Sequence, residues 1–458
     1  MRQCLGNMPH CQWGKPTLMV LLYLAITNSC LCHAYAANQQ RKPNFVIIMA
    51  DDLGYGDIAC FGNKKINTPH IDALAQQGIK FTDFHSNGVV CSPTRAALLT
   101  GRYQQRSGVE GVVTAKSHRH KGMALKETTF AEVLKPAGYT TGMFGKWHVG
   151  YPAKYNPVHQ GFSEYVGFVS GNVDYHSHVD QEMFLDWWKG DKIDNEPGYL
   201  TDLITDYGVT FIKQHQEQPF CLYLAHGAPH YPYQGRHDPA MRQAGQPRTR
   251  EAIPDVERRY KEMIEVMDEG VGRIVSTLKD LGLQRDTLVF FLSDNGPTGK
   301  VVTLFNSAGP LRGTKGTVWE GGHRVPAVAS WPGHIPAGRV SHQIGMGMDL
   351  LVTMASLAKA PLPVNHRFDG VDLSPVLLGQ GTLSPRTLFW RAGKGKVARK
   401  GSWKLVVQGK KTQLYNLGQD IGEQTDLSQA EPKVKAELLK ALEAWEADVS
   451  KDVVKVSG

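Results

Sequence analysis

Cysteine is scarce in this chain, with 7 residues among 458. Four of them lie within the first 36 positions, which leaves Cys60, Cys91 and Cys221 for the rest of the chain. So few cysteines exclude a fold held together by a disulfide framework. Cys60 and Cys221 could pair if Cys91 is chemically modified, but the apolar run around Cys221 favours two small buried thiols.

Long apolar runs are missing as well. The apolar run Thr17–Thr27 is shorter than a membrane-spanning helix requires. Together with positive charge at Arg2 and Lys15 and a small-residue cleavage site at Ala34–Ala36, it predicts that residues 1–36 are a secretory signal peptide. We therefore expect export to the periplasm or the medium, and no transmembrane segment in the mature chain. Two cysteines just before the cleavage site leave lipoprotein anchoring as the less favoured alternative.

The charge is not concentrated in blocks, and no nucleic-acid-binding module is visible. The chain carries 51 Lys and Arg against 43 Asp and Glu, a formal net charge of +8. A basic balance suits a polyanionic partner such as a sulfated polysaccharide, and we predict that nucleic acid is not a partner. The length suits one large domain and a smaller one.

The pattern of elements predicts an α/β fold. Buried β-branched or apolar runs at Asn44–Ala50, Tyr139–Phe144, Phe220–Ala225 and Thr287–Leu292 read as strands, and helical patterns lie between them. Alternating strands and helices favour a large mixed, mostly parallel sheet sandwiched by helices, which we assign to residues 41–383. In such sheets the functional site lies outside the carboxyl ends of the strands.

The remaining residues, 384–458, predict a small α+β subdomain. Short strands near Val397 and at Trp403–Val407 and Gln413–Tyr415 indicate an antiparallel sheet, and an amphipathic helix follows at about Glu431–Lys451. No internal repeat is present.

The stretch Val90–Arg102 (VCSPTRAALLTGR) is the most informative in the chain. Ser92 is a good N-cap, Pro93 suits the first helical position and Gly101 can end the helix. Cys91 is thus predicted just before a helix N-terminus, where free backbone N–H groups favour an anion or an ionised nucleophile. Taken alone, the stretch is better explained by a half-buried cysteine beside a capped helix than by a nucleophile.

Polar side chains follow two of the predicted strands. Asp51 and Asp52 come directly after the first strand, and Asp294 and Asn295 follow a later one. Adjacent carboxylates repel each other unless a cation or an arginine lies between them. A solvated loop is the alternative. If a cation is held there, aspartate and asparagine oxygens are hard ligands that suit Ca²⁺ first and Mg²⁺ second.

Several motifs together resemble the type I sulfatases of the alkaline-phosphatase superfamily, in particular the arylsulfatase and N-acetylgalactosamine-sulfatase branch. The resemblance covers nearly all of the chain after the leader. It rests on CSPTR at 91–95 with TGR following, DDLG at 51–54, GKWHVG at 145–150, APHYP at 228–232, SDNG at 293–296 and RGTKGTVWEGGHRVP at 312–326.

The resemblance implies a covalent mechanism and a set of site residues. A maturation enzyme would oxidise Cys91 to formylglycine, an aldehyde whose hydrate is the nucleophile. One Ca²⁺ would be held by Asp51, Asp52, Cys91, Asp294 and Asn295. The catalytic residues implied are Cys91, Arg95, Lys146, His148, His230 and Lys315. Lys146 and His148 lie two apart, and on an extended segment they would point the same way.

Substrate contact is predicted for the His-rich segment around residues 172–180. Asp174, His176 and His178 alternate there, so on an extended strand they would share a face. The spacing matches no zinc motif well. The resemblance places this region at the pocket, so we expect the three residues to read a sulfated galactan or glycosaminoglycan.

Two other functions are compatible with parts of the sequence. A phosphodiesterase or phosphonate hydrolase of the same superfamily would use similar metal chemistry. A secreted polysaccharide-binding protein would have the same fold with Cys91 unmodified.

Overall fold

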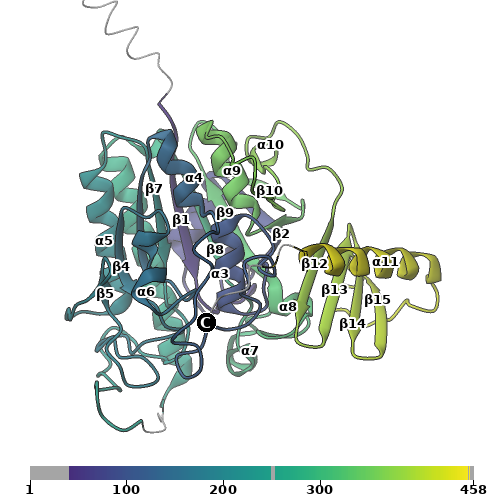
Figure 1. Cartoon of the computed structure of the whole chain (residues 1–458), viewed down its shortest axis with the longest axis horizontal. Coiled ribbons are helices and arrows are strands. Elements are labelled where there is room, and N and C mark those ends of the chain that lie inside the picture. The colour runs from purple at the N-terminus through teal and green to yellow at the C-terminus, as the bar shows by residue number, and fades with distance from the viewer. Residues whose placement is uncertain (1–40, 249–252, 452, 454–458) are drawn as a thin grey trace, which may run out of the picture. The chain divides into compact units, whose positions relative to one another are not determined.

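A computed structural model describes residues 41–248, 253–451 and 453 of the chain, so the predicted signal peptide lies outside the described residues. Residues 43–451 form one unit built around an eleven-stranded sheet (Figure 1). The strands are β1 (Asn44–Ala50), β2 (Ile79–His85), β3 (Thr140–Lys146), β4 (Glu164–Phe168), β5 (Trp188–Lys189), β6 (Lys192–Ile193), β7 (Phe220–Ala225), β8 (Thr287–Ser293), β9 (Arg324–Ser330), β10 (Arg339–Ser341) and β11 (Gly345–Met346).

The order of the large sheet is β10-β2-β9-β8-β1-β7-β3-β4-β5-β6, with β11 beside β2. The central strands β8, β1, β7, β3 and β4 are parallel. β9 runs antiparallel to both β8 and β2. The predicted mixed, mostly parallel sheet is therefore confirmed, and the carboxyl ends of the central strands share one edge.

Helices cover both faces of this sheet, because alternate apolar side chains of β1 point to opposite faces and all of them are buried. Phe45, Ile47 and Met49 belong to one core with α3, α4 and α9, whereas Val46 and Ile48 belong to a second core with α2, α5 and α6. Both faces of a central parallel strand are thus buried. The helices are α2 (Pro69–Gln77), α3 (Cys91–Thr100), α4 (Phe130–Leu134), α5 (Leu200–Gln214), α6 (Val256–Asp280), α7 (Gly299–Phe305), α8 (Glu320–His323), α9 (Asp349–Ala358), α10 (Ser374–Leu377) and α11 (Pro432–Val449). Among the described residues, no helix is both long and apolar enough to span a membrane.

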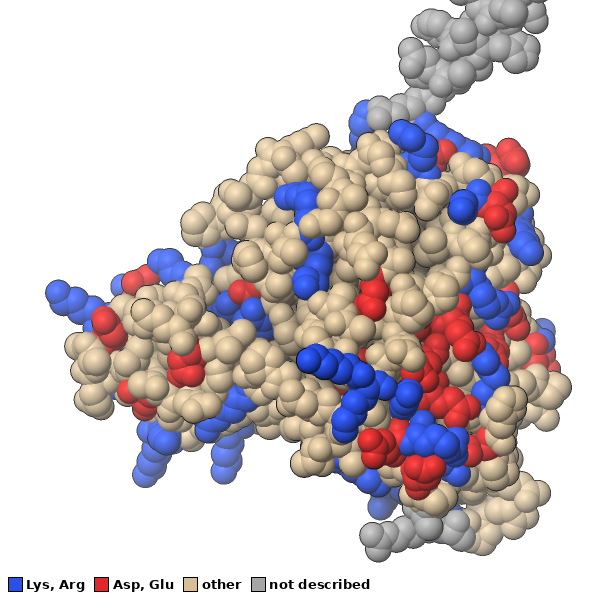
Figure 2. Space-filling model, turned by 180° about the vertical axis from the view of Figure 1, so that it is seen from behind, with Lys and Arg blue, Asp and Glu red and all other residues tan. Residues whose placement is uncertain are grey.

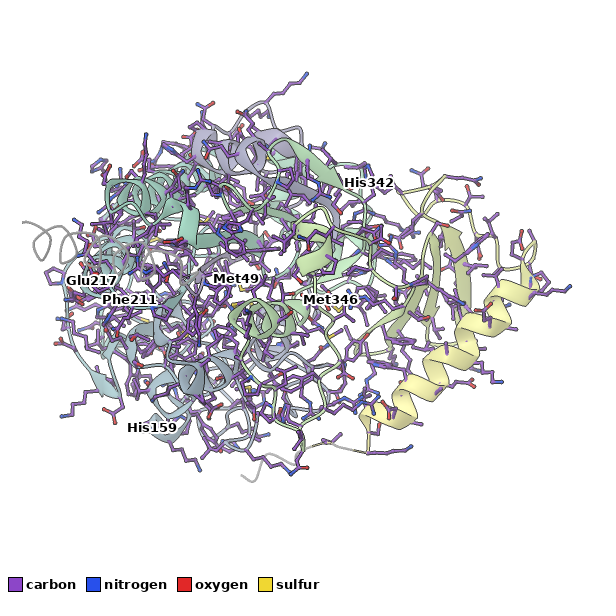
Figure 3. The ribbon with its side chains drawn as sticks, turned by 90° about the horizontal axis from the view of Figure 1, so that it is seen from above. Met49, His159, Phe211, Glu217, His342 and Met346 are labelled. Atoms are coloured by element: carbon purple, nitrogen blue, oxygen red, sulfur yellow. The ribbon has the colours of Figure 1, made fainter. Side chains whose placement is uncertain are left out.

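A four-stranded antiparallel sheet follows, in the order β12 (Thr387–Ala392), β13 (Gly395–Lys400), β14 (Trp403–Gln408) and β15 (Lys411–Asn416). α11 packs on it through Leu438, Leu442 and Trp445. The same core includes Met346 of β11 and the residues Val89 and Val90 that precede α3. The two sheets therefore share apolar contacts. In Figure 3, Met49 lies inside the larger part, and Met346 lies on the side toward the smaller sheet. The boundary near residue 384 stays a prediction.

A buried ion-pair network joins α8 to the smaller sheet. Lys404 Nζ lies 2.9 Å from Glu320 Oε1 and 2.7 Å from Glu423 Oε1, and all three side chains are fully buried. Removing one partner from a buried network leaves charge without compensation. We expect Lys404→Ala to lower the free energy of unfolding by about 3–5 kcal/mol.

The matched control is Lys400→Ala, which removes the same side chain four positions away. Lys400 pairs with Glu437 at 2.7 Å, but both side chains are more than half exposed. Its loss should change the free energy of unfolding by no more than about 1 kcal/mol. Denaturant titration of the two variants measures both values, and equal shifts would contradict the buried role of Lys404.

Candidate active site

The carboxyl edge of the large sheet gathers polar side chains from separate parts of the chain. Asp51 and Asp52 follow β1, and Asp294 and Asn295 follow its neighbour β8. Asn295 Nδ2 donates to Asp52 Oδ1 at 2.7 Å, and the Asp52 amide donates to Asp294 Oδ1 at 3.3 Å. The structure thus brings these two predicted pairs together, because parallel neighbouring strands end side by side.

The nucleophile candidate Cys91 is the first residue of α3, so the prediction that the helix starts after Ser92 is wrong. Val90 is the N-cap in an extended conformation, with no side-chain cap. Ser92 does not cap because its Oγ accepts a hydrogen bond from the amide of Val113 at 3.0 Å. Gly101 ends the helix as predicted, at φ 65°. Cys91 therefore lies in the first turn, where the helix dipole favours negative charge.

Two lysines surround the Cys91 thiol. Lys315 Nζ lies 3.4 Å from Cys91 Sγ and also bonds Asp52, while Lys146 Nζ bonds Asp51. Burial would raise the pKa of the Cys91 thiol, but the charges of Lys146 and Lys315 outweigh burial and hold it well below its usual range. The two ammonium groups therefore favour the ionised form of the Cys91 thiol.

Arg95 extends one helical turn from Cys91 to the carboxylates. Its Nε and Nη2 atoms donate to Asp294 Oδ2 at 3.2 and 2.9 Å, and Nη1 donates to the carbonyl of Lys146 at 2.9 Å. Burial and the nearby Asp51 raise the pKa of Asp294 to about 6, although Arg95 opposes the shift. Arg95 thus fixes Asp294 and the end of β3, and its predicted contact with residue 91 stays a prediction.

The side-chain oxygen atoms that have no hydrogen-bond partner at this edge of the sheet suit a hard divalent cation. Asp51 Oδ1, Asp52 Oδ2 and Asn295 Oδ1 are buried and make no hydrogen bond. Buried polar atoms are almost always satisfied, so three unpaired oxygens on adjacent strand ends indicate a ligand. Ligand atoms of Asp51, Asp52, Cys91 and His230 also lie within 4.8 Å of one another. His230 belongs to this cluster although the sequence assigned it only to catalysis.

The two predicted catalytic histidines have different environments. His230 Nδ1 donates to the carbonyl of Tyr231 at 2.6 Å, which leaves Nε2 facing Asp52 Oδ2 at 3.6 Å. Burial lowers the pKa of His230, but the charge of Asp52 raises it further, so the net shift is upward.

His148 Nε2 donates to the carbonyl of Val113 at 3.1 Å, and its Nδ1 is buried without a partner. Burial and the charges of Lys146 and Arg95 hold the pKa of His148 well below its usual range. A neutral ring with a free Nδ1 lone pair can accept a proton. The expectation that Lys146 and His148 share a face of an extended segment is wrong, because His148 has φ 58°.

The segment predicted to read the substrate is not extended. Asp174, His176 and His178 lie in a turn, and His178 has φ 56°. Asp174 is fully buried, and its carboxylate accepts hydrogen bonds from five groups, including the amides of Met241 and Arg242. The side chains do not share one solvent-facing surface, so the argument from alternation fails.

His176 and His178 have separate surroundings. His176 Nε2 donates to the carbonyl of Gly235 at 3.1 Å, and its ring is partly exposed. His178 is buried and stacks on Trp187 with ring centroids 4.6 Å apart. Neither contact could be predicted from local spacing, because Gly235 is far from His176 in the sequence and Trp187 lies beyond the turn that carries His178.

Tyr175 is a residue of the site that sequence reasoning missed. Its hydroxyl lies 2.6 Å from the carbonyl of Gly227 and 3.0 Å from that of His230. It is buried and holds the turn that carries His230. No local pattern marks it, because its partners lie more than fifty residues further along the chain.

Comparison with known proteins agrees with this geometry. The family model described as Sulfatase matches residues 43–360. Human arylsulfatase A (Homo sapiens) is 39% identical over 372 residues, covering 76% of this chain and 70% of that protein. The N-acetylgalactosamine-6-sulfatase of Canis lupus familiaris is 36% identical over 384 residues, covering 78% and 70%.

Solved structures show the same fold. Ps i-CgsB in complex with k-i-k-neocarrahexaose superposes with a TM-score of 0.79 at 30% identity, covering 91% of this chain and 94% of that one. The PsFucS1 sulfatase from Pseudoalteromonas sp. superposes with a TM-score of 0.74 at 25% identity, covering 93% and 94%. The chain therefore belongs to the sulfatase family and is a sulfuric ester hydrolase.

Proposed function

We propose that this protein hydrolyses sulfate esters of a sulfated polysaccharide or oligosaccharide, using a formylglycine made from Cys91 by a maturation enzyme. The observation that carries the proposal is the position of Cys91, in the first turn of α3 with Lys315 Nζ at 3.4 Å and carboxylates beyond it. A sulfated galactan or glycosaminoglycan is the favoured substrate, supported by the relatives and by the net charge of +8.

The unpaired oxygens suit one divalent cation, and we assign it as Ca²⁺, with Mg²⁺ the second choice. The residues that would hold it are Asp51, Asp52, Asp294, Asn295 and modified Cys91. Bound there, the cation would lower the pKa of a hydroxyl at residue 91 and offset charge on the sulfate oxygens.

The other residues bind the sulfate and move protons. Lys146 and Lys315 donate to sulfate oxygens, whose negative charge grows in the transition state. His230 holds a proton at Nε2 and gives it to the leaving alcohol. His148 then accepts, at its free Nδ1, the proton of the second hydroxyl of the residue 91 hydrate. Arg95 holds Asp294 in place.

Replacing His230 with asparagine should therefore harm poor leaving groups most. Proton donation by a positioned side chain contributes about 100- to 10,000-fold. We expect a loss of this size in kcat/KM for alkyl and sugar sulfates, and a loss of no more than about ten-fold for para-nitrophenyl sulfate, whose leaving phenolate needs little protonation. The dependence of log kcat/KM on leaving-group pKa should steepen. If the slope of log kcat/KM against leaving-group pKa did not change, His230 would not be the general acid.

The reaction itself is tested with the mature enzyme on two substrates. Para-nitrophenyl sulfate should be hydrolysed, whereas bis(para-nitrophenyl) phosphate should be turned over at least about 100-fold more slowly, since a phosphate diester has a second ester group where the sulfate offers a free oxygen. The reverse preference would favour a phosphodiesterase. No turnover of either, with binding of a sulfated glycan, would favour a polysaccharide-binding protein.

We also propose export, with residues 1–36 removed. Amino-terminal sequencing of the secreted or periplasmic protein tests this directly. A mature chain that starts near residue 37 supports it, and a lipid-modified cysteine at the new end would favour membrane anchoring instead.

A further inference from the structure

A loop next to the active site carries positive charge and no acidic residue. Residues 111–126 include Lys116, Arg119, Lys121 and Lys126 and contain no Asp or Glu. Around α5 and α6, by contrast, basic side chains pair with acidic ones, for example Arg236 with Asp202 at 2.9 Å. Figure 2 shows one such surface, where acidic and basic side chains mix. The loop itself has no acidic residue, and Arg119 pairs with Asp180 from outside it.

The loop is tied to the catalytic residues at its base. The amide of Val113 donates to Ser92 Oγ at 3.0 Å, directly beside Cys91, and its carbonyl accepts from His148 Nε2 at 3.1 Å. At the other end, the amide of Met123 donates to the carbonyl of Val149 at 2.6 Å. Lys116 is three residues from Val113, so its Cα lies within about 11 Å of the Val113 Cα. The loop that carries these cations is thus anchored beside the catalytic residues at both ends.

The exposed cations of this loop are available for a ligand. Lys116, Arg119 and Lys121 are exposed. Arg119 already bonds Asp180, but no hydrogen bond or ion pair of the Lys116 or Lys121 ammonium group occurs among the described residues. Two free ammonium groups near a sulfate-binding site suit a second anionic group of the same substrate.

An aromatic side chain completes this surface. Phe184 is 57% exposed, and no other phenylalanine or tryptophan of the described residues is as exposed. The Arg119 guanidinium lies 4.3 Å from the centre of its ring. Phe184 belongs to the strand-like turn that pairs Asp180 with Val173, and Val173 lies with Asp51 and His230 around a small cavity. The aromatic ring and the loop therefore flank the same site.

We propose that Lys116, Arg119, Lys121 and Phe184 form a subsite, named here the basic rim, that binds a second sulfated sugar of the glycan whose scissile sulfate occupies the active site. The proposal rests on the proposed sulfatase function. The lysines pair with sulfate, and the ring packs on the apolar face of a sugar. Substrate contact by Asp174, His176 and His178 stays a separate prediction, which the rim does not require.

The test measures competition against para-nitrophenyl sulfate, which has one sulfate and no sugar. The competitor is a carrageenan oligosaccharide of four to six sugars, and the neutral probe is an agarose oligosaccharide of the same length. The rim variants are Lys116→Ala/Lys121→Ala and Phe184→Ala. The matched control, Lys410→Ala/Lys411→Ala, removes two exposed lysines at the β14–β15 turn.

We expect the inhibition constant of the sulfated oligosaccharide to rise roughly ten-fold in each rim variant and to stay within about two-fold in the control. Turnover of para-nitrophenyl sulfate should be unchanged in all of them, and Phe184→Tyr should restore binding. Unchanged inhibition in both rim variants, or an equal loss in the control, overturns the rim. So does stronger competition by micelles of a sulfated galactolipid than by the oligosaccharide, which would assign the surface to lipid.

Failure of the rim is distinguishable from failure of the proposed function. If the mature wild-type enzyme does not hydrolyse para-nitrophenyl sulfate, the proposed reaction fails. Calorimetric titration with the oligosaccharide then measures binding without turnover. Loss of that binding in the rim variants supports the subsite, and its absence in the wild type contradicts it.

Discussion

Replacing Cys91 with alanine should abolish hydrolysis of every sulfate ester while leaving the fold intact. Removing a covalent nucleophile costs about 10,000-fold or more in kcat. The cost in stability should be small, because only one sulfur atom is lost from the first turn of α3. The assay is turnover of para-nitrophenyl sulfate, with circular dichroism and thermal unfolding to check the fold.

Cys221 provides the matched control, since its thiol is fully buried in β7 and free. Cys221→Ala removes an equal volume from the core and should retain near-normal activity. Cys91→Ser should also be inactive unless the host's maturation system accepts serine. Near-normal activity of Cys91→Ala would rule out the covalent mechanism.

Chelation should remove activity and thermal stability together. Without a cation, the carboxylates of Asp51, Asp52 and Asp294 would repel one another apart from their contacts with Lys146, Lys315 and Arg95. An ion that binds only the folded state at about 100 times its Kd stabilises it by about 2.7 kcal/mol. We therefore expect the melting temperature to fall by several degrees when EGTA removes Ca²⁺.

The control is re-addition of metal. Excess Ca²⁺ should restore both activity and melting temperature, and Asp52→Asn should respond weakly to either treatment. Elemental analysis of the active protein should give about one calcium per chain. Zinc without calcium would contradict the assignment and would turn attention to the histidines.

The sequence predicted the parts of the site that depend on strand ends. Asp51 and Asp294 follow long apolar runs, and parallel neighbours must end at one edge, so their meeting follows from topology. The positions of Lys315 and His230 came from the family resemblance, because no local periodicity brings them to Cys91. In the described structure these side chains meet around Cys91: Lys315 contacts Cys91, His230 faces Asp52, and Arg95 pairs with Asp51 and Asp294.

Where the predictions failed, the side chain forms a hydrogen bond with a backbone group that is distant in the sequence. Ser92 fits an N-cap by type, but the amide of Val113, twenty-one residues away, uses its hydroxyl. Asp174 was expected to share an exposed face with His176 and His178, but amides near residue 241 bond its buried carboxylate. β12 was missed because its apolar residues Leu388, Phe389 and Trp390 are consecutive, so its sequence shows no alternation of polar and apolar residues. Long-range hydrogen bonds of this kind leave no trace in local spacing.

The most direct test of the central claim is the mass of the peptide that carries residue 91, taken from enzyme active on para-nitrophenyl sulfate. We predict that this peptide contains formylglycine in place of Cys91, in a fraction that rises and falls with specific activity across preparations. Fully active enzyme with an unmodified Cys91 thiol would contradict the account.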